Sequence, residues 1–359
     1  MKIRRAVVHP LCLPLPRPLR TAIHEIRTVD TVLVELQGDG GAVGVGYCFA
    51  FGERRARALQ ALVEDLAPIY EGGEAAAARA LFDRAWASIN FVGHAGVAVM
   101  ALAALDTACW DLAARAAGLP LWRLLGGDRS RVPTYASSGL WLDRSLDELV
   151  AEARGFVAAG HRAMKMRLGK STAEDLTRAR ALREALGPDI HLMADVNQGW
   201  DEATAIRTGR ALEAIGLYWL EEPLPYEDLE GAARVAAALD TPIASGETEY
   251  GWLGMKRYLD ARAADILMPD LQRMGGVSGY LKAVALCEAY QRPVSSHLFV
   301  EVSGHVLAAA PHGVMLEYMD WWQPLFEERL PVVDGHVILS ERPGLGVTLD
   351  RKALARLAA

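Results

Sequence analysis

The chain has 359 residues, about twice the length of a typical domain, so two domains or one large barrel are expected. Hydrophobic residues make up 52% and charged residues 23% of the sequence, which is the composition of a globular protein and excludes a disordered one. The formal net charge of -7 leaves no basic surface for a phosphate backbone, so nucleic acid is not expected as a partner.

The N-terminal segment has the basic residues of a signal peptide, but four prolines between positions 10 and 18 break any apolar helix there. The most apolar run, Val97–Leu105, stops at Asp106 and is too short to span a bilayer. The four cysteines lie far apart without a C-x-x-C pair, which indicates reduced thiols rather than a disulfide framework or a zinc site. A cytoplasmic protein without a membrane partner is expected.

The first part of the chain combines strand patterns with helical ones. Thr31–Leu36 predicts a strand, and the turn Gly38–Gly41 leads into a second strand at Ala42–Tyr47. Residues 53–118 are rich in alanine, leucine and arginine and predict helices, so this part is an α+β domain. The last helix carries one apolar stripe, formed by Leu102, Leu105, Cys109 and Leu112.

From about residue 131, short apolar runs alternate with helical stretches, which predicts parallel βαβ units closing into a barrel. An open, doubly wound sheet is the alternative, but no Gly-x-Gly-x-x-Gly follows any run. After Glu317 no helical pattern is present, and a turn-rich tail is expected to leave the barrel and pack on the first domain. The eight predicted strands are Val132–Ala136, Ala163–Arg167, Ile190–Asp195, Tyr218–Glu221, Pro242–Glu247, Ile266–Asp270, Pro293–His297 and Val314–Glu317.

Ionisable residues mark the ends of these runs, at steps of 20 to 30 residues that match one βα unit each. In a barrel the carboxyl ends of all strands share one face, where active sites form. One such residue could be an ordinary surface charge, but seven at one repeat indicate a functional site, because burying each ion costs on the order of several kcal/mol. The seven are Lys165, Asp195, Glu221, Glu247, Asp270, His297 and Glu317.

Three carboxylates, Asp195, Glu221 and Glu247, come from consecutive strands and would repel one another without a counter-ion. Their hard oxygen atoms suit Mg²⁺, and no second histidine or cysteine joins them to favour zinc. These three residues are therefore the predicted metal ligands.

Strand alternation assigns the neighbouring side chains to one side or the other. Asn197 should face the same way as Asp195, and Arg167 the same way as Lys165. Glu222 should point outward and be structural rather than a ligand.

Asp270 and His297 end neighbouring strands, and a carboxylate that holds one imidazole nitrogen fixes the tautomer and raises the basicity of the other. This pair predicts a general base. A Ser/His/Asp hydrolase is the alternative, but Ser295 and Ser296 precede the histidine on its own strand and no Gly-x-Ser-x-Gly motif is present.

At these residues the chain resembles the mandelate racemase branch of the enolase superfamily, within the mandelate racemase/muconate lactonizing enzyme family. The resemblance covers nearly the whole length, and its motifs occur in the family's order. They are ALDTACWDLA at 104–113, GLPL at 118–121, LGG at 125–127, DVN at 195–197, WLEEP at 219–223, SGE at 245–247, MPD at 268–270, GGV at 275–277 and SSHL at 295–298.

The resemblance implies an α/β fold with a modified (β/α)7β TIM-type barrel at residues 126–322. Residues 1–125 would form an α+β capping domain, to which a C-terminal tail, residues 323–359, returns. It also implies Mg²⁺ on the three carboxylates above and a small-molecule carboxylate substrate, whose α-proton is removed to give a metal-stabilised enediolate. A homo-oligomer is expected.

The resemblance further implies roles for single residues. His297 with Asp270 would be an acid or base, Lys165 and Glu317 would hold the substrate carboxylate, and Asn197 would contact an oxygen beside the metal.

One position departs from the family, which has Lys-x-Lys at the end of the second barrel strand, with the second lysine as a base opposite the histidine. Here the triplet is Lys165-Met166-Arg167. Arginine has a pKa above about 12 and seldom gives up its proton, so two-base racemisation is disfavoured. Arg167 is expected to act as an electrophilic clamp or to pair with an anionic substrate.

A one-base reaction fits better: dehydration of a hydroxy acid or acid sugar to a 2-keto acid, with His297 taking the α-proton and protonating the departing β-hydroxyl. A racemase or epimerase of an α-hydroxy acid and a non-catalytic binding derivative are the alternatives. In the family, the loop near residues 20–30 selects the substrate; here Thr21 and His24 make it polar, which favours a hydroxylated or charged substrate. Trp321 and Trp322 could line the pocket or hold the tail to the cap.

Overall fold

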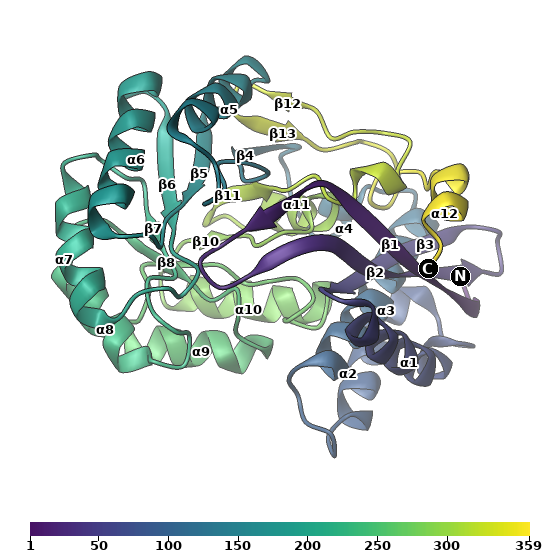
Figure 1. Ribbon diagram of the computed structural model, residues 1–359. Coiled ribbons are helices and arrows are strands. Elements are labelled where there is room, and N and C mark those ends of the chain that lie inside the picture. Colours follow the sequence, from purple (N-terminus) through teal and green to yellow (C-terminus); the bar gives the residue numbers. More distant parts are fainter.

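All 359 residues are described by the computed structural model, which combines a three-stranded antiparallel sheet and its helices with an eight-stranded barrel (Figure 1). The sheet has the order β1 (Ile3–Arg20), β2 (Glu25–Gly38), β3 (Val43–Ala50). The predicted strands at residues 31–36 and 42–47 are confirmed as parts of β2 and β3. The sequence does not predict β1, because its prolines are unusual in a strand. β1 is an edge strand, with β2 as its neighbour in the sheet, and edge strands tolerate proline.

Helices α1 (Glu53–Tyr70) and α3 (Val97–Ala117) pack on this sheet, and α2 (Ala78–Ser88) packs against these two helices. β3 lies directly on α3, and glycines at positions 44 and 46 permit this close approach. A Cβ atom added at Gly44 or Gly46 would lie 2.1 Å from a carbonyl oxygen of the helix. A short 3-10 helix, Ala75–Ala77, precedes α2, and α4 (Leu121–Leu124) follows α3.

From the sequence, the apolar run at residues 97–105 is too short to span a membrane. This run is only the first half of α3, however. By length and composition the whole helix is long and apolar enough to cross one. Most of its apolar window is buried inside the fold, however, and a core helix of a folded protein passes the same test.

Eight parallel strands follow in the order β4 to β11, and pairing of β11 with β4 closes them into a barrel. Each predicted apolar run contains one of these strands, so the barrel is confirmed and the open-sheet alternative is wrong. The strands are β4 (Arg131–Ala136), β5 (Ala163–Arg167), β6 (His191–Asp195), β7 (Leu220–Glu221), β8 (Ile243–Ser245), β9 (Ile266–Leu267), β10 (Val294–Ser295) and β11 (Gly313–Tyr318).

A helix connects each pair of successive barrel strands. The first two begin at serines whose hydroxyl groups accept a hydrogen bond from the backbone N–H of the third helical residue. That residue is a glutamate, whose carboxylate accepts a hydrogen bond from the serine N–H. Side-chain caps of this kind determine the residue at which a helix starts, and so they determine where the preceding loop ends. The helices are α5 (Leu146–Ala158), α6 (Thr172–Leu186), α7 (Glu202–Glu213), α8 (Leu229–Ala238), α9 (Gly251–Ala261), α10 (Val277–Ala289) and α11 (Val300–Ala308).

The C-terminal tail leaves the barrel after β11, passes through a 3-10 turn at Gln323–Leu325 and contacts both units. β12 (Val332–Val333) and β13 (His336–Ile338) form a small hairpin, and β13 pairs antiparallel with β4 on the barrel. The tail therefore extends the barrel sheet before it reaches the cap. The domain boundaries at 125/126 and 322/323 stay a prediction.

Beyond this hairpin the chain ends in α12 (Arg351–Leu357), so the expectation of no helix after Glu317 is wrong. Seven residues are too few for an apolar period to show in the sequence. The helix begins at Asp350, whose carboxylate accepts hydrogen bonds from two backbone N–H groups of the first turn. It lies against the N-terminal sheet, close to both chain ends (Figure 1).

The motif around residues 104–113 joins the two units. Asp106 of α3 accepts hydrogen bonds from the backbone N–H and the hydroxyl of Ser278 at the start of α10, at 2.8 and 2.7 Å, and Trp110 Nε1 donates to the same hydroxyl at 2.8 Å. Burial raises the pKa of Asp106 to about 7. Asp111, one turn on, accepts from the N–H groups of Val45 in the sheet and Leu345 in the tail.

Glu35 of β2 binds the tail, with its two carboxylate oxygens 2.6 Å from the guanidinium of Arg351 and one of them 2.8 Å from His9 Nε2. Burial raises the pKa of Glu35, but His9 and Arg351 outweigh it and lower the pKa from 4.5 to about 2. The contact therefore stabilises the fold fully above about pH 4.5, and this contribution is lost as the pH falls towards 2.

We expect Glu35→Gln to lower the free energy of unfolding by about 2 kcal/mol at pH 7 and by roughly half of that or less at pH 3. Urea denaturation at the two pH values measures both losses. Equal losses at pH 7 and pH 3 would contradict the ionic origin of the contact.

Candidate active site

The turn between β1 and β2 covers the carboxyl ends of the barrel strands (Figure 1). Its tip, Ala22, fits a notch in the barrel loops: a Cβ atom added at Gly169 or Gly199 would lie 2.8 or 3.0 Å from the Ala22 Cβ. Thr21 and His24 of the turn line the cavity underneath, as expected. The Thr21 hydroxyl accepts hydrogen bonds within the turn, from the N–H groups of residues 23 and 24.

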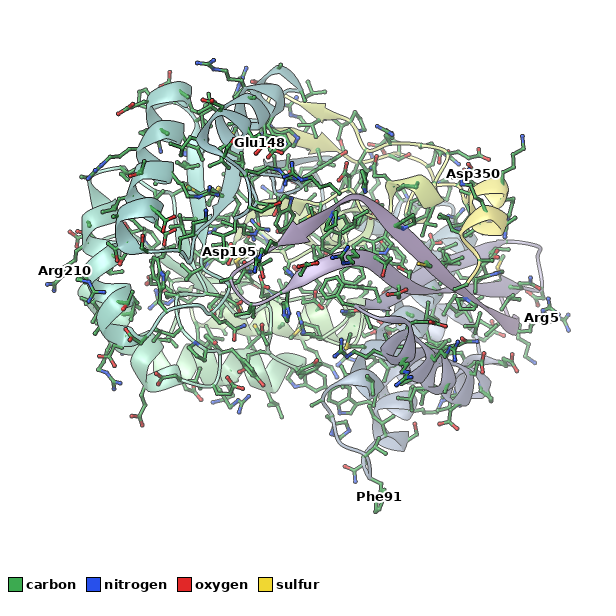
Figure 2. The ribbon with its side chains drawn as sticks, viewed as in Figure 1. Arg5, Phe91, Glu148, Asp195, Arg210 and Asp350 are labelled. Carbon is green, nitrogen blue, oxygen red and sulfur yellow. The ribbon has the colours of Figure 1, made fainter.

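The cavity has a volume of about 280 Å³ and lies between this turn and the barrel; Asp195, labelled beside the turn in Figure 2, is among its lining residues. Most of the predicted site residues line it, whereas Glu221 and Asp270 lie behind the wall. Its polar lining consists of Thr21, His24, Lys165, Arg167, Asp195, Asn197, Gln198, Glu222, Glu247, Thr248, Arg273, His297 and Glu317.

The Lys165 ammonium lies among three carboxylates. Its Nζ is 2.5 Å from Glu221 Oε1, 3.0 Å from Glu317 Oε1 and 3.4 Å from Asp195 Oδ2. Burial lowers the pKa of Lys165, but the carboxylates, Glu221 first, outweigh it and raise the pKa well above its usual value. This arrangement favours the ammonium form of Lys165.

Glu317 joins several groups at the end of β11. Its carboxylate accepts hydrogen bonds from the Ser137 hydroxyl at 2.6 Å and from the Leu298 N–H at 2.7 Å. Burial raises the pKa of Glu317, but Lys165 and His297 outweigh it and lower the pKa to about 2. Glu317 is therefore an anion that orients the cations around it.

His297 and Asp270 form the predicted pair. The Asp270 Oδ2 atom accepts a hydrogen bond of 2.7 Å from Nδ1 of the imidazole. Nε2 points to the cavity side and lies 3.3 Å from Glu247 Oε1. Burial lowers the pKa of His297, but Glu247, Asp270 and Glu317 outweigh it and raise the pKa to about 9.

Arg167 is buried beside Lys165 on β5, with the guanidinium stacked 4.6 Å from the ring centre of Trp141. Nη2 donates to the Ser137 hydroxyl at 3.1 Å, and Nε lies 3.5 Å from Asp195 Oδ2. Nε and Nη1 donate no hydrogen bond to the protein. This guanidinium is a fixed positive charge with free N–H groups, which suits an anion and not proton abstraction.

The predicted metal ligands fit Mg²⁺ in donor chemistry and follow consecutive barrel strands. Asp195 and Glu221 are direct partners on adjacent strands, and Glu247 follows the next strand. Glu247 Oε2 and Asn197 Oδ1 are buried without a hydrogen-bond partner. No three carboxylates form a compact ligand set, because Glu221 is held by Lys165 and by Trp219 Nε1 at 2.9 Å. The ligand set stays a prediction.

The expectation that Glu222 points outward is wrong. Its carboxylate is buried and lines the cavity, where it accepts hydrogen bonds from Gln198 at 3.0 Å and Thr248 at 3.1 Å. β7 ends at residue 221, and Glu222 has a φ of +39°, so strand alternation does not reach it.

Both tryptophans after β11 have a role. Trp321 lines the cavity, whereas Trp322 is fully buried, donates to the Thr31 hydroxyl at 3.0 Å and stacks on Phe299. Each of the two sequence interpretations is therefore correct for one tryptophan.

Two family descriptions match the chain. The "Mandelate racemase / muconate lactonizing enzyme, N-terminal domain" matches residues 3–126, and the "Enolase C-terminal domain-like" family matches residues 148–353, more than half of the chain. The chain belongs to the mandelate racemase/muconate lactonizing enzyme family. It is therefore an enolase-superfamily enzyme, and the family resemblance of its sequence motifs is confirmed.

Named members of the mandelate racemase/muconate lactonizing enzyme family match over nearly the whole chain. The L-talarate/galactarate dehydratase of Salmonella typhimurium is 37% identical over 95% of this chain and 87% of its own length. The 3,6-anhydro-alpha-L-galactonate cycloisomerase of Streptomyces coelicolor is 34% identical, over 96% of each chain. The crystal structure of the Salmonella dehydratase with Mg and L-lyxarohydroxamate matches with a TM-score of 0.96 at 35% identity, over 100% of this chain and 93% of that one.

Proposed function

We propose that this enzyme is an acid-sugar dehydratase, which removes the α-proton of a hydroxylated carboxylic acid and expels the β-hydroxyl as water. The observation that carries the proposal is the asymmetry of the cavity. One side holds a histidine–carboxylate pair, His297 and Asp270, and the β5 side holds the fixed cations Lys165 and Arg167. The 37% identity to a talarate/galactarate dehydratase supports it.

One proton-transfer group suffices for this reaction. The neutral form of His297 takes the proton from the α-carbon at Nε2 while Asp270 holds Nδ1. The resulting imidazolium gives that proton to the β-oxygen, the carbon–oxygen bond breaks, and water leaves. The enol product takes a proton from solvent at the β-carbon and becomes a 2-keto acid, so substrate equals product plus water. Lys165 and Arg167 offset the charge of the substrate carboxylate.

Asp195, Glu221 and Glu247 would hold Mg²⁺, and Asn197 would contact an oxygen beside it. When bound, the ion supplies positive charge next to the substrate carboxylate, where negative charge grows as the α-proton leaves. The all-oxygen donor set and the buried, unpartnered Oε2 of Glu247 support this assignment, as does the Mg in the solved relative.

A cycloisomerase is the second candidate, favoured by the 34% identity to a cycloisomerase that matches along 96% of both chains. A ring whose oxygen is attached to the β-carbon opens by the same removal of the α-proton, but the leaving oxygen stays on the product. Such a reaction also needs one base.

The test is to incubate acid sugars of each α-configuration with the enzyme and Mg²⁺ in D₂O. NMR follows the α-proton, and mass spectrometry follows the product. We expect only one α-epimer to exchange and its product to be a 2-keto acid lighter by one water. Exchange of both epimers would support a racemase instead, and a keto product of unchanged mass would support the cycloisomerase.

Ser137 links the anion and the cation of the β5 side, since its hydroxyl donates to Glu317 and accepts from Arg167. Ser137→Ala removes both bonds, each worth about 1 kcal/mol, so we expect kcat/KM to fall roughly tenfold or more. Thr134→Val is the matched control, because Thr134 is on the same strand but its hydroxyl bonds a backbone carbonyl outside the cavity. Equal effects of the two changes would contradict a positioning role for Ser137.

A further inference from the structure

The guanidinium of Arg273 lines the cavity without a carboxylate partner. Nη1 donates to the backbone carbonyl of Glu247 at 2.8 Å, Nε is buried without a partner, and the Tyr250 side chain lies beside the guanidinium. The two nearest carboxylates are already engaged: Asp270 binds Nδ1 of His297, and Glu247 faces Nε2. Burial lowers the pKa of Arg273, but its neighbours, Asp270 first, outweigh burial and raise it, and the unpartnered Nε–H is left to donate to a further anion.

Arg273 stands far from the other cations of the cavity. It follows β9, whereas Lys165 and Arg167 are on β5, four strands away in a closed barrel of eight. Strands four apart in such a barrel lie across its axis from one another. The cavity therefore presents positive charge on two opposite sides, to an acid that spans it.

The acidic neighbours of Arg273 are Glu222, Glu247, Asp270 and Tyr250, and its basic neighbour inside the cavity, His24, adds no positive charge. Burial lowers the pKa of His24, and the charges of Arg273 and Arg55 lower it further, so the imidazole of His24 is neutral. Arg55 itself is exposed and lies outside the cavity lining. Arg273 is thus the cation that a ligand meets on this side.

We propose that Arg273 binds a second carboxylate at the far end of the substrate, so that the enzyme selects dicarboxylic over monocarboxylic sugar acids. The inference rests on the proposed function, which places the first carboxylate of the substrate beside Lys165 and Arg167. Family membership does not decide it, because one relative is named for the dicarboxylates talarate and galactarate and another for a monocarboxylate, an anhydrogalactonate.

The test compares two six-carbon sugar acids of the same configuration, with a carboxylate or a CH₂OH group at the far carbon. Their dissociation constants are measured by calorimetry with Mg²⁺ in the His297→Asn variant, so that binding is measured without turnover. We expect the dicarboxylate to bind roughly tenfold to a hundredfold more tightly, the range for one charge-assisted pair. Arg273→Met should reduce this preference to about twofold or less, and Arg273→Lys should keep part of it.

Arg55→Gln is the matched control, since it removes a positive charge near the cavity mouth but no cavity contact; the preference should stay unchanged. Weakening of both acids by the same factor in Arg273→Met would show that the residue only supports the Glu247 loop and would overturn the proposal. Absence of any preference, or of binding of either acid, in the parent protein would also overturn it. A dicarboxylate that binds through Arg273 but neither exchanges its α-proton nor loses water in the wild type would refute the proposed function alone.

Discussion

Replacement of His297 by asparagine is expected to lower α-proton exchange and 2-keto acid formation together by about a thousandfold or more. General acid–base groups contribute roughly 10² to 10⁴ in rate, and here one imidazole serves both proton transfers. Asparagine retains a hydrogen-bonding side chain towards Asp270 but cannot take a proton from carbon. NMR in D₂O measures the exchange, and an assay for 2-keto acids measures turnover.

Asp270→Asn is expected to cause a smaller loss of activity than His297→Asn. The carboxylate fixes the proton of His297 on Nδ1 through the 2.7 Å bond, and an amide does so less well, so exchange and turnover should fall by a smaller factor than with His297→Asn. Thermal unfolding of both variants verifies that the fold is intact. If His297→Asn exchanged the α-proton at the wild-type rate, the base would lie elsewhere, with Lys165 the first residue to examine.

Loss of one metal ligand is expected to have an effect of similar size. Asp195→Asn or Glu247→Gln should weaken Mg²⁺ binding and lower kcat/KM by about a thousandfold, because a bound ion contributes several kcal/mol to the stabilisation of developing charge. Calorimetry with Mg²⁺ measures the binding separately from activity. Chelation of Mg²⁺ with EDTA should abolish turnover, and added Mg²⁺ should restore it.

Glu249→Gln is the matched control for these variants. Glu249 is also buried and only two residues from Glu247, but it pairs with Arg257 at 2.7 Å and does not line the cavity. Its replacement should change kcat/KM by about twofold or less. Full activity of the wild type after removal of all metal would refute the assignment of the three carboxylates.

The barrel and the residues at its strand ends could be predicted because one pattern repeats eight times. Seven of the eight apolar runs close on an ionisable residue, so counting along the chain is enough to place Asp270 beside His297, one strand apart. The structure brings these two side chains to 2.7 Å. A period of this kind fixes which strand end carries a residue, even where the strand itself has only two residues.

What the sequence could not provide lies in the loops after the strands. Glu222 turns into the cavity because its φ of +39° breaks the alternation, and no residue pattern marks that turn. Gln198, Thr248 and Arg273 line the cavity from loops whose conformation depends on tertiary contacts. Likewise, the prolines of β1 hide a strand that lies at the edge of its sheet, where proline is tolerated.

The contact of α3 with Ser278 affects how this enzyme could be engineered. The loop that carries Asp270 and Arg273 ends at Ser278, which Asp106 and Trp110 of the cap hold by three hydrogen bonds. A Cβ atom added at Gly276 of this loop would lie 2.7 Å from the Asp106 carboxylate, so neither partner has room to shift.

A chimera that takes a whole cap from one relative and a barrel from another would thus change two contacts at once. It would replace the α3 residues that hold the loop with Asp270 and Arg273, and it would replace the turn at residues 20–25 above the cavity. The turn itself touches the barrel through Ala22, in a notch formed by two glycines. Grafting residues 20–25 alone, with α3 left in its own barrel, changes the cavity lining at Thr21 and His24 and leaves the contact of α3 with Ser278 undisturbed.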